Sequence, residues 1–289
     1  MNSKWCIIYL ASPKENRVNC PEFSAIKKFD LLKGSLEIAK RVFPSIDILI
    51  FHEDFTETEW DALPPVTQYI QVDFSGMQEL YDQAPEHHFP RGYMQMCRFF
   101  SGGVQGHEAL QSYSHYLRLD DDSYFLEPYP TELHVHQWLL KDYTFRTLFH
   151  ERINQQSLYE FTLAFCAGYK DFDRYFLEIK DKYLKSMGFL RGDDTYSGIA
   201  PYNNFHVSSL NLWRHPMIKA YTDAIDDGKF IMTKGWLDAN IHAMIIFILM
   251  PYCNLNTYFD GSFGYRHNKH LSLPNSHRMQ WVSSLTFTP

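Results

Sequence analysis

Short apolar segments and helical spacings alternate along the first part of the chain. The segments 5–10 and 46–51 are typical of buried strands. Between them, apolar residues recur at helical spacing from Phe23 to Val42. The pattern therefore predicts a strand, a helix over 21–43 and a second strand, joined by a right-handed crossover.

The remaining patterns extend this alternation of helix and strand. Thr56 and Glu59 have the spacing of a capping box at a helix start. The further elements that we predict are a strand at 69–74, a helix at 92–102, a strand within 114–125, a strand at 161–169, helices at 172–187 and near 216–224, and a helix that begins at 235–238 and carries the apolar run 243–250. Residues 254–289 have little periodicity and read as loop and tail. With no internal repeat or linker, a single α/β domain is the simplest division.

Composition and charge narrow the class of protein. Hydrophobic residues make up 45% of the chain and charged residues 21%, which argues against disorder. The net charge is −7 and no basic stripe is evident, so nucleic acid is not an expected partner. The apolar run 243–250 is far below the ~20 residues of a membrane span. With no signal peptide and five cysteines without CxxC spacing, we expect a soluble, cytoplasmic chain without disulfides or zinc.

Three consecutive carboxylates follow the predicted strand at 114–119. Asp120, Asp121 and Asp122 raise one another's pKa when packed together, and a divalent cation relieves that cost. Mg²⁺ and Mn²⁺ favour carboxylate oxygens and complete their shells with water and phosphates, so the triplet suggests a metal-diphosphate site. A solvated acidic turn is the alternative. Ala11 and Ser12 end the first strand, where a sheet of this class binds nucleotides, although a plain turn is equally compatible.

Six segments resemble, in the same order, the fungal α-1,2-mannosyltransferase family, glycosyltransferase family 15. They are 51–57, 92–102 (GYMQMCRFFSG), 116–122 (YLRLDDD), 202–206 (YNNFH), 238–242 (DANIH) and 264–267 (GYRH). The resemblance implies a GT-A fold, a mixed α/β sheet with flanking helices in one domain. It places the nucleotide-sugar-binding part at about 1–125 and the acceptor-binding and catalytic part at about 126–289.

The resemblance also implies roles for particular residues. The family pattern Glu-Pro-Asp falls on the acidic triplet, which makes Asp122 a direct metal ligand and gives Asp120 a supporting role at the donor. The family's C-terminal metal-binding histidine falls on His267, and a carboxylate with an imidazole suits Mn²⁺, or Mg²⁺ in its place. The alternative is a structural role for His267, which is one of 14 histidines in the chain.

Four further residues are functional candidates, and three of them have a structural alternative. Arg98 is a candidate cation for the diphosphate or a partner in a salt bridge. Tyr93, one helical turn away, is a candidate for the donor pocket. Trp236 can stack on an acceptor sugar or fill the core. Asp238 matches an active-site aspartate of the family and is our candidate general base, while a helix N-cap is the structural alternative.

The chain departs from the family at two points. The family has a glutamate shortly after its Tyr-Asn-x-Cys-His segment, whereas residues 207–214 contain no carboxylate, which favours an inverting reaction with Asp238 as base. Fungal members also carry a membrane anchor and stem, which we do not expect in this chain from its sequence. In this it is similar to the anchorless enzymes that large algal viruses encode for their capsid glycans.

The sequence therefore predicts a metal-dependent glycosyltransferase that moves a sugar from a nucleotide sugar to a hydroxyl of a glycan or glycoside acceptor. The donor is GDP-mannose or UDP-xylose. The alternatives are a nucleotide-sugar hydrolase or pyrophosphorylase, and an inactive carbohydrate-binding domain that kept the fold.

Overall fold

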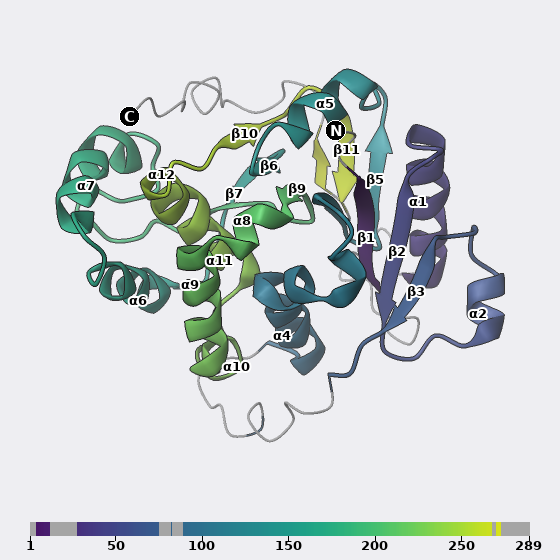
Figure 1. The fold of residues 1–289 in the computed structure, drawn as a ribbon, viewed down its shortest axis with the longest axis horizontal. Coiled ribbons are helices and arrows are strands. Elements are labelled where there is room, and N and C mark those ends of the chain that lie inside the picture. Colours follow the sequence, from purple (N-terminus) through teal and green to yellow (C-terminus); the bar gives the residue numbers. More distant parts are fainter. Residues whose placement is uncertain (1–3, 12–27, 75–81, 83–88, 268–269, 273–289) are drawn as a thin grey trace.

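A seven-stranded mixed sheet forms the centre of the protein (Figure 1). The computed structural model describes residues 4–11, 28–74, 82, 89–267 and 270–272. The strands of the central sheet are, in spatial order, β10 (Thr257–Phe259), β6 (Tyr143–Phe145), β9 (Phe205–Ser209), β4 (His115–Leu119), β1 (Trp5–Ala11), β2 (Asp47–His52) and β3 (Gln68–Gln71). Strands from both ends of the chain share this sheet. The predicted nucleotide-sugar-binding part (about 1–125) and acceptor-binding part (about 126–289) therefore do not form separate sheets.

Strand direction explains why the sheet is mixed. β1 pairs in parallel with β2 and β4, β2 with β3, and β10 with β6, whereas β9 runs antiparallel to both β4 and β6. Two smaller sheets are formed by β5 (Ser123–Leu126), β11 (Gly264–His267) and β12 (His270–Ser272), and by β7 (Leu148–His150) with β8 (Ile199–Pro201). The predicted mixed α/β sheet with flanking helices is confirmed.

Helices cover both faces of the central sheet (Figure 1). The α-helices among the described residues are α1 (Lys28–Val42), α2 (Glu57–Asp61), α4 (Arg91–Arg98), α5 (Glu132–Leu139), α6 (Gln156–Cys166), α7 (Phe172–Ile179), α8 (Leu210–Arg214), α9 (Pro216–Asp227), α10 (Phe230–Lys234), α11 (Asp238–Met244) and α12 (Met250–Tyr252). π-helical turns at Phe99–Gly103, Lys180–Lys185 and Ile245–Leu249 extend α4, α7 and α11. The capping box of Thr56 and Glu59 is present at the start of α2.

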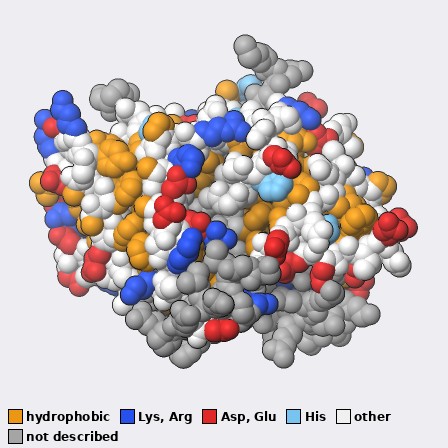
Figure 2. All heavy atoms as spheres, turned by 60° about the horizontal axis from the view of Figure 1, so that its bottom comes forward, with side chains coloured by type: hydrophobic (Ala, Val, Ile, Leu, Met, Phe, Trp, Pro, Cys, Tyr) orange, Lys and Arg blue, Asp and Glu red, His pale blue; other side chains and the backbone are white. Residues whose placement is uncertain are grey.

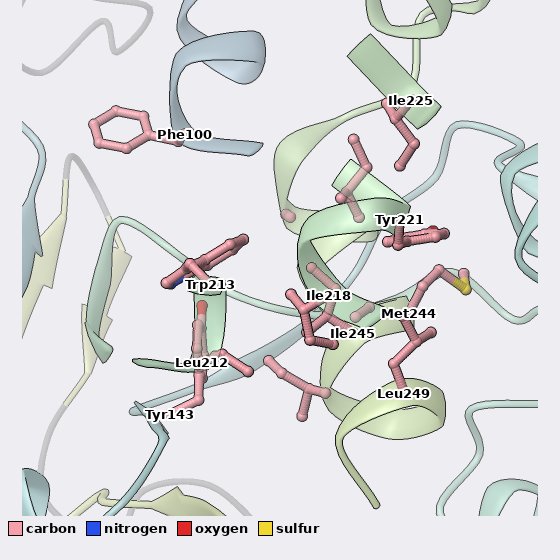
Figure 3. Close-up of a cluster of buried hydrophobic side chains, with 14 of the residues drawn as sticks. Phe100, Tyr143, Leu212, Trp213, Ile218, Tyr221, Ile225, Met244, Ile245 and Leu249 are labelled. Carbon is pink, nitrogen blue, oxygen red and sulfur yellow. The ribbon is translucent and has the colours of Figure 1, made fainter. Parts of the chain in front are cut away.

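Each face of the sheet has its own hydrophobic core. Alternate residues of β1 point to opposite faces, so Ile7 and Tyr9 pack with α1 while Cys6 and Ile8 belong to the larger cluster on the other face. Figure 3 shows part of that larger cluster, in which Tyr221 of α9 and Met244 of α11 lie beside one another. Burial on both faces is why the parallel strands read as continuous apolar runs.

Two predictions about elements are wrong. Residues 161–169, predicted as a strand, lie largely in α6, because Leu158, Tyr159, Thr162 and Cys166 form one buried helical face. The C-terminal segment, predicted as loop, contributes β10, β11 and β12, which are too short for their periodicity to show in the sequence.

The described surface mixes charges of both signs. On the face in Figure 2, acidic and basic side chains alternate with small hydrophobic areas. Among the described residues, no helix combines the length and hydropathy that a membrane span requires.

Candidate active site

The acidic triplet lies at the carboxyl end of β4, where three chain segments meet. Asp120–Asp122 form the turn between β4 and β5. Because Leu119 pairs with Phe205 of β9, the preceding residue, Asn204, lies beside the triplet, and its carbonyl accepts a hydrogen bond from the Asp120 amide at 3.3 Å. β11 pairs with β5 in a register that sets His267 opposite Ser123. The sheet pairings therefore bring the C-terminal histidine to the triplet.

Asp122 and His267 are in direct contact. Nε2 of His267 lies 2.9 Å from Oδ1 of Asp122 and 3.6 Å from Oδ2 of Asp120. Burial alone would raise the pKa of Asp122, but the hydrogen bond and charge of His267 hold it below its ordinary value. Conversely, burial alone would lower the pKa of His267, and Asp122 raises it. The other ring nitrogen, Nδ1, is hydrogen-bonded to the hydroxyl of Tyr202 at 2.7 Å.

Asp121 has a different environment from its two neighbours. It is buried, and Nζ of Lys28 lies 3.5 Å from its carboxylate. The pKa of Asp121 is raised to about 6, because burial, Asp122 and Asp120 raise it more than Lys28 lowers it. The middle carboxylate is therefore costly to ionise in the absence of a further cation.

Arg118 connects the triplet with Asp238. Its side chain is only 2% exposed, although it lies on a strand of apolar neighbours. Nε donates to Oδ1 of Asp120 at 2.9 Å, and Nη1 donates to Oδ2 of Asp238 at 2.7 Å. The guanidinium also lies 3.5 Å from the ring centroid of Phe100. Burial alone would lower the pKa of Arg118, but the two carboxylates raise it, so the cation is fixed between them.

Asp238 is the first residue of α11, and it accepts three hydrogen bonds. Besides Arg118, Nδ2 of Asn203 donates to Oδ2 at 2.9 Å, and the thiol of Cys97 donates to Oδ1 at 3.4 Å. Burial alone would raise its pKa, but Arg118, His242 and the hydrogen bond from Asn203 together lower it below its ordinary value. The N-cap is Leu237 and makes no side-chain cap bond, so the capping alternative for Asp238 is wrong.

The other candidate residues divide between the site and its surroundings. Ala11 is buried at the end of β1 and pairs with His52 of β2, whereas Ser12 lies outside the described residues. Tyr93 is 39% exposed on α4, one turn before Cys97, and its ring packs against that of Phe89. Trp236 is a core residue, 3% exposed, whose Nε1 donates to Ser157.

Arg98 forms the salt bridge that was its structural alternative. Its Nη2 lies 2.9 Å from Oδ2 of Asp226 on α9, and its Nε donates to the same carboxylate. The pair lines a pocket in which none of the acidic triplet, Asp238 and His267 takes part. The hydrogen bonds of Arg98 therefore go to a side chain and not toward the triplet.

Sequence reasoning missed four residues that complete the arrangement: Cys97, Arg118, Tyr202 and Asn203. Arg118 carried a usable signal, since a charge within a buried apolar strand needs a partner. Cys97, Tyr202 and Asn203 lay within segments that carried the family resemblance, but their contacts depend on the folded topology.

Asp120, Asp122 and His267 are the residues at the triplet that could hold a divalent metal. In the part of the chain that the structure describes, no group of three or more His, Cys, Asp and Glu side chains is placed to hold a metal ion. Asp122 and His267 offer one carboxylate and one imidazole in contact, which leaves the remaining positions of a Mn²⁺ shell to water and phosphate oxygens. These two residues would hold the metal, with Asp120 beside them.

Comparison with known proteins identifies the family. A family profile described as Glycolipid 2-alpha-mannosyltransferase matches residues 64–286. The chain belongs to this family. It is 28% identical over 191 residues to Glycolipid 2-alpha-mannosyltransferase of Saccharomyces cerevisiae, a match that covers 63% of this chain and 40% of the relative. It is 26% identical over 225 residues to O-glycoside alpha-1,2-mannosyltransferase homolog 2 of Schizosaccharomyces pombe, covering 76% and 57%. The chain thus spans less than two thirds of the length of each of these two relatives.

Solved structures of similar proteins confirm the fold of this chain. Core-mannan synthase A from Aspergillus fumigatus, solved in a Mn/GDP form, superimposes with a TM-score of 0.70 at 18% identity, over 95% of this chain and 77% of the other. The mannosyltransferase Ktr4p from Saccharomyces cerevisiae in complex with GDP gives a TM-score of 0.70 at 17% identity, over 94% and 73%. At this identity the likeness establishes the GT-A fold.

Proposed function

We propose that this protein is a metal-dependent mannosyltransferase that transfers mannose from GDP-mannose to a hydroxyl of a glycan acceptor. The contact between Asp122 and His267 at the end of β4, in a chain of this family, carries the proposal. A bound Mn²⁺ would neutralise the charge that develops on the leaving diphosphate. The chain's own residues bind and orient the donor beside the acidic triplet.

The comparisons favour a GDP-linked donor over a UDP-linked one. The matched relatives are named as mannosyltransferases, and two of the superimposed structures contain GDP, one of them with Mn. UDP-xylose, the second candidate from the sequence, has no such support. GDP-mannose is therefore the donor that we propose.

Two roles are open to Asp238. A general base must reach the acceptor hydroxyl and hold a pKa near the working pH, whereas Asp238 is 3% exposed, its pKa is lowered, and three of its roughly four lone-pair positions are taken. These contacts support a positioning role, in which Asp238 fixes Arg118 and Arg118 fixes Asp120. The base, and the inverting course that depends on it, stay predictions.

A donor panel tests the proposal. The protein is incubated with GDP-mannose, UDP-xylose and UDP-glucose, with Mn²⁺ or with EDTA, in the presence and absence of α-mannoside acceptors. We expect transfer only with GDP-mannose and Mn²⁺, and release of GDP that requires acceptor. Equal release of GDP without acceptor would indicate the hydrolase instead, and no turnover with any donor would indicate the inactive binding domain.

The configuration of the product tests the stereochemical course. An inverting enzyme converts the α-linked donor into a β-linked product, which NMR of the anomeric proton identifies. An α-linked product excludes inversion and with it Asp238 as the base of a direct displacement.

A further inference from the structure

A pocket of about 420 Å³, lined by both polar and apolar side chains, lies outside the candidate active site. It is formed by the end of β3 and the residues that follow it, by α4 with its π-helical extension, and by α9 and α10. Asp120, Asp122, Asp238 and His267 do not line it. Its volume falls within the range of roughly 300–1,000 Å³ that is typical of small-molecule sites.

Helix α4 is the wall that this pocket shares with the candidate active site. The thiol of Cys97 contacts Asp238, and Sδ of Met96 lies 3.5 Å from Nη2 of Arg118. Gln95 and Arg98, on the same helix, line the pocket. The pocket is therefore a separate hollow on the other side of α4, close to the site in space.

The lining of the pocket carries one guanidinium group and three carboxylates. Arg98 is paired with Asp226 at 2.9 Å, and Asp223 is paired with Lys219 at 2.6 Å. Asp73 adds a third carboxylate to the lining. A phosphate would need a cation that is not already neutralised, and it would meet the excess of carboxylates. The lining is therefore unsuited to the anionic donor.

The same side chains are well suited to a neutral ligand with many hydroxyl groups. Paired carboxylates and guanidinium groups keep further lone pairs and N–H donors for hydrogen bonds. Phe74 and Phe99, whose ring centroids lie 5.9 Å apart, add apolar surface next to these polar groups. A pyranose ring has the matching pattern of hydroxyl edges and an apolar C–H face.

We propose that this pocket is a second glycan-binding site that holds one sugar residue of the acceptor at a distance from the point of transfer. The inference rests on the proposed function, since the acceptor of a glycan-extending enzyme is itself a chain of sugars. A chain long enough to reach both sites binds more tightly than a monosaccharide, because its second contact is intramolecular.

Two neighbouring glycines allow a matched test. Gly103 lines the pocket, and a Cβ added there would meet the carbonyl oxygen of Arg98 at 3.6 Å, an ordinary contact, so the backbone accepts a side chain at this position and Gly103→Leu adds bulk to the wall. Gly106, three residues later and also exposed, does not line the pocket, and a Cβ there meets nothing within 4 Å. Gly106→Leu is therefore the control.

Binding is measured first, without donor, by saturation-transfer NMR with α-1,2-linked mannotriose. We expect a signal with the wild type and Gly106→Leu, and its loss or strong reduction with Gly103→Leu. Transfer from GDP-mannose is then measured with mannotriose and with methyl α-mannoside. We expect Gly103→Leu to raise KM for mannotriose about tenfold and to leave kcat and KM for methyl α-mannoside unchanged.

The outcomes separate this inference from the proposed function. No mannotriose signal with the wild type, or equal KM values for mannotriose in the two glycine variants, overturns the second site while the transfer assay still supports the enzyme. Absence of any transfer with the wild type overturns the proposed function, and the donor-free NMR experiment still tests the pocket.

Discussion

Arg118 and Asp238 form a buried ion pair in which Nη1 lies 2.7 Å from Oδ2 and the two side chains are 2% and 4% exposed. The same guanidinium holds Asp120 through Nε at 2.9 Å. A carboxylate at the start of α11 and a carboxylate at the end of β4 are thus linked by one planar cation. Buried charges are tolerated when paired in this way, and removing one partner leaves the other uncompensated.

We expect Asp238→Asn to weaken binding of GDP with Mn²⁺ as well as catalysis. The amide cannot balance the charge of Arg118, so Arg118 no longer has a fixed position next to Asp120. Loss of a buried pair also lowers the free energy of unfolding, here by up to about 3 kcal/mol because the amide keeps some hydrogen bonds. Arg118→Lys is expected to act in the same direction, since lysine lacks the fork that reaches both carboxylates.

Isothermal titration calorimetry of GDP with Mn²⁺, well below the melting temperature, is the measurement. The control is Asp181→Asn, which breaks the exposed pair with Lys185 and is expected to change nothing. If Asp238→Asn binds GDP like the wild type while kcat falls ~10²–10⁴-fold, the positioning role is wrong and Asp238 is the general base.

The sequence predicts an element correctly where its hydrophobic periodicity extends over many residues. The prediction is wrong where the pattern is short. The apolar segments of β1 and β2 and the stripe of α1 were predicted because burial on each face dictates them over several turns or residues. Residues 161–169 were assigned as strand because Phe161, Phe165 and the apolar residues between them suit either structure. Only packing against the rest of the core selects the helix.

The sequence predicted only those residues of the candidate site that lie in segments resembling the family. Asp122 and His267 are 145 positions apart, and their 2.9 Å contact depends on the pairing of β11 with β5. Arg98 lies in a segment that resembles the family, but its predicted role is not what the structure shows. The segment does not reveal that Asp226 of α9 lies next to Arg98. Ion pairs between distant elements are properties of the topology, which local patterns do not contain.

Tyr202 is expected to support metal binding through His267. Its hydroxyl is hydrogen-bonded to Nδ1 at 2.7 Å, which leaves Nε2 for the metal. Hydrogen-bond partners of ligating histidines typically contribute 10–100-fold to metal affinity. We expect Tyr202→Phe to weaken Mn²⁺ binding in the presence of GDP by about this factor, and His267→Ala to weaken it further.

Electron paramagnetic resonance of free Mn²⁺ measures this affinity directly. Tyr258→Phe, which removes an exposed hydroxyl bonded to Gln137, is the control and should bind Mn²⁺ like the wild type. A His267→Ala variant whose Mn²⁺ titration overlays that of the wild type would remove the histidine from the site.

Gly264 allows β11 to lie close to β5. A Cβ at this position would lie 2.6 Å from the carbonyl oxygen of Leu126 and 2.7 Å from that of Glu127, both backbone atoms that cannot move aside cheaply. We expect Gly264→Ala to shift β11 and with it His267, which lowers both the melting temperature and Mn²⁺ affinity. Gly168→Ala is the control, since its Cβ meets only the carbonyl oxygen of Phe165 at 3.9 Å. Unchanged Mn²⁺ affinity in Gly264→Ala would contradict the link between strand pairing and the histidine.

Asp121 gives the protein a pH-dependent stability in the absence of metal. Its pKa is raised from 3.8 to about 6, first by burial and then by Asp122 and Asp120. Between these two values the folded protein binds more protons than the unfolded chain, so the free energy of unfolding falls as pH rises from about 4 to about 6, and the loss persists at higher pH. A difference of one between the folded and unfolded pKa changes the free energy of unfolding by about 1.4 kcal/mol.

Asp121→Asn removes this charge while keeping the shape of the side chain. In EDTA at pH 7.5 we expect the variant to be more stable than the wild type by roughly 1–3 kcal/mol, with the lost Lys28 contact reducing the gain. At pH 4.5 the difference should shrink, because Asp121 is then largely protonated in the folded wild type. Chemical denaturation at the two pH values measures both differences. A variant that is less stable at pH 7.5 would show that Lys28 outweighs burial and repulsion at this position.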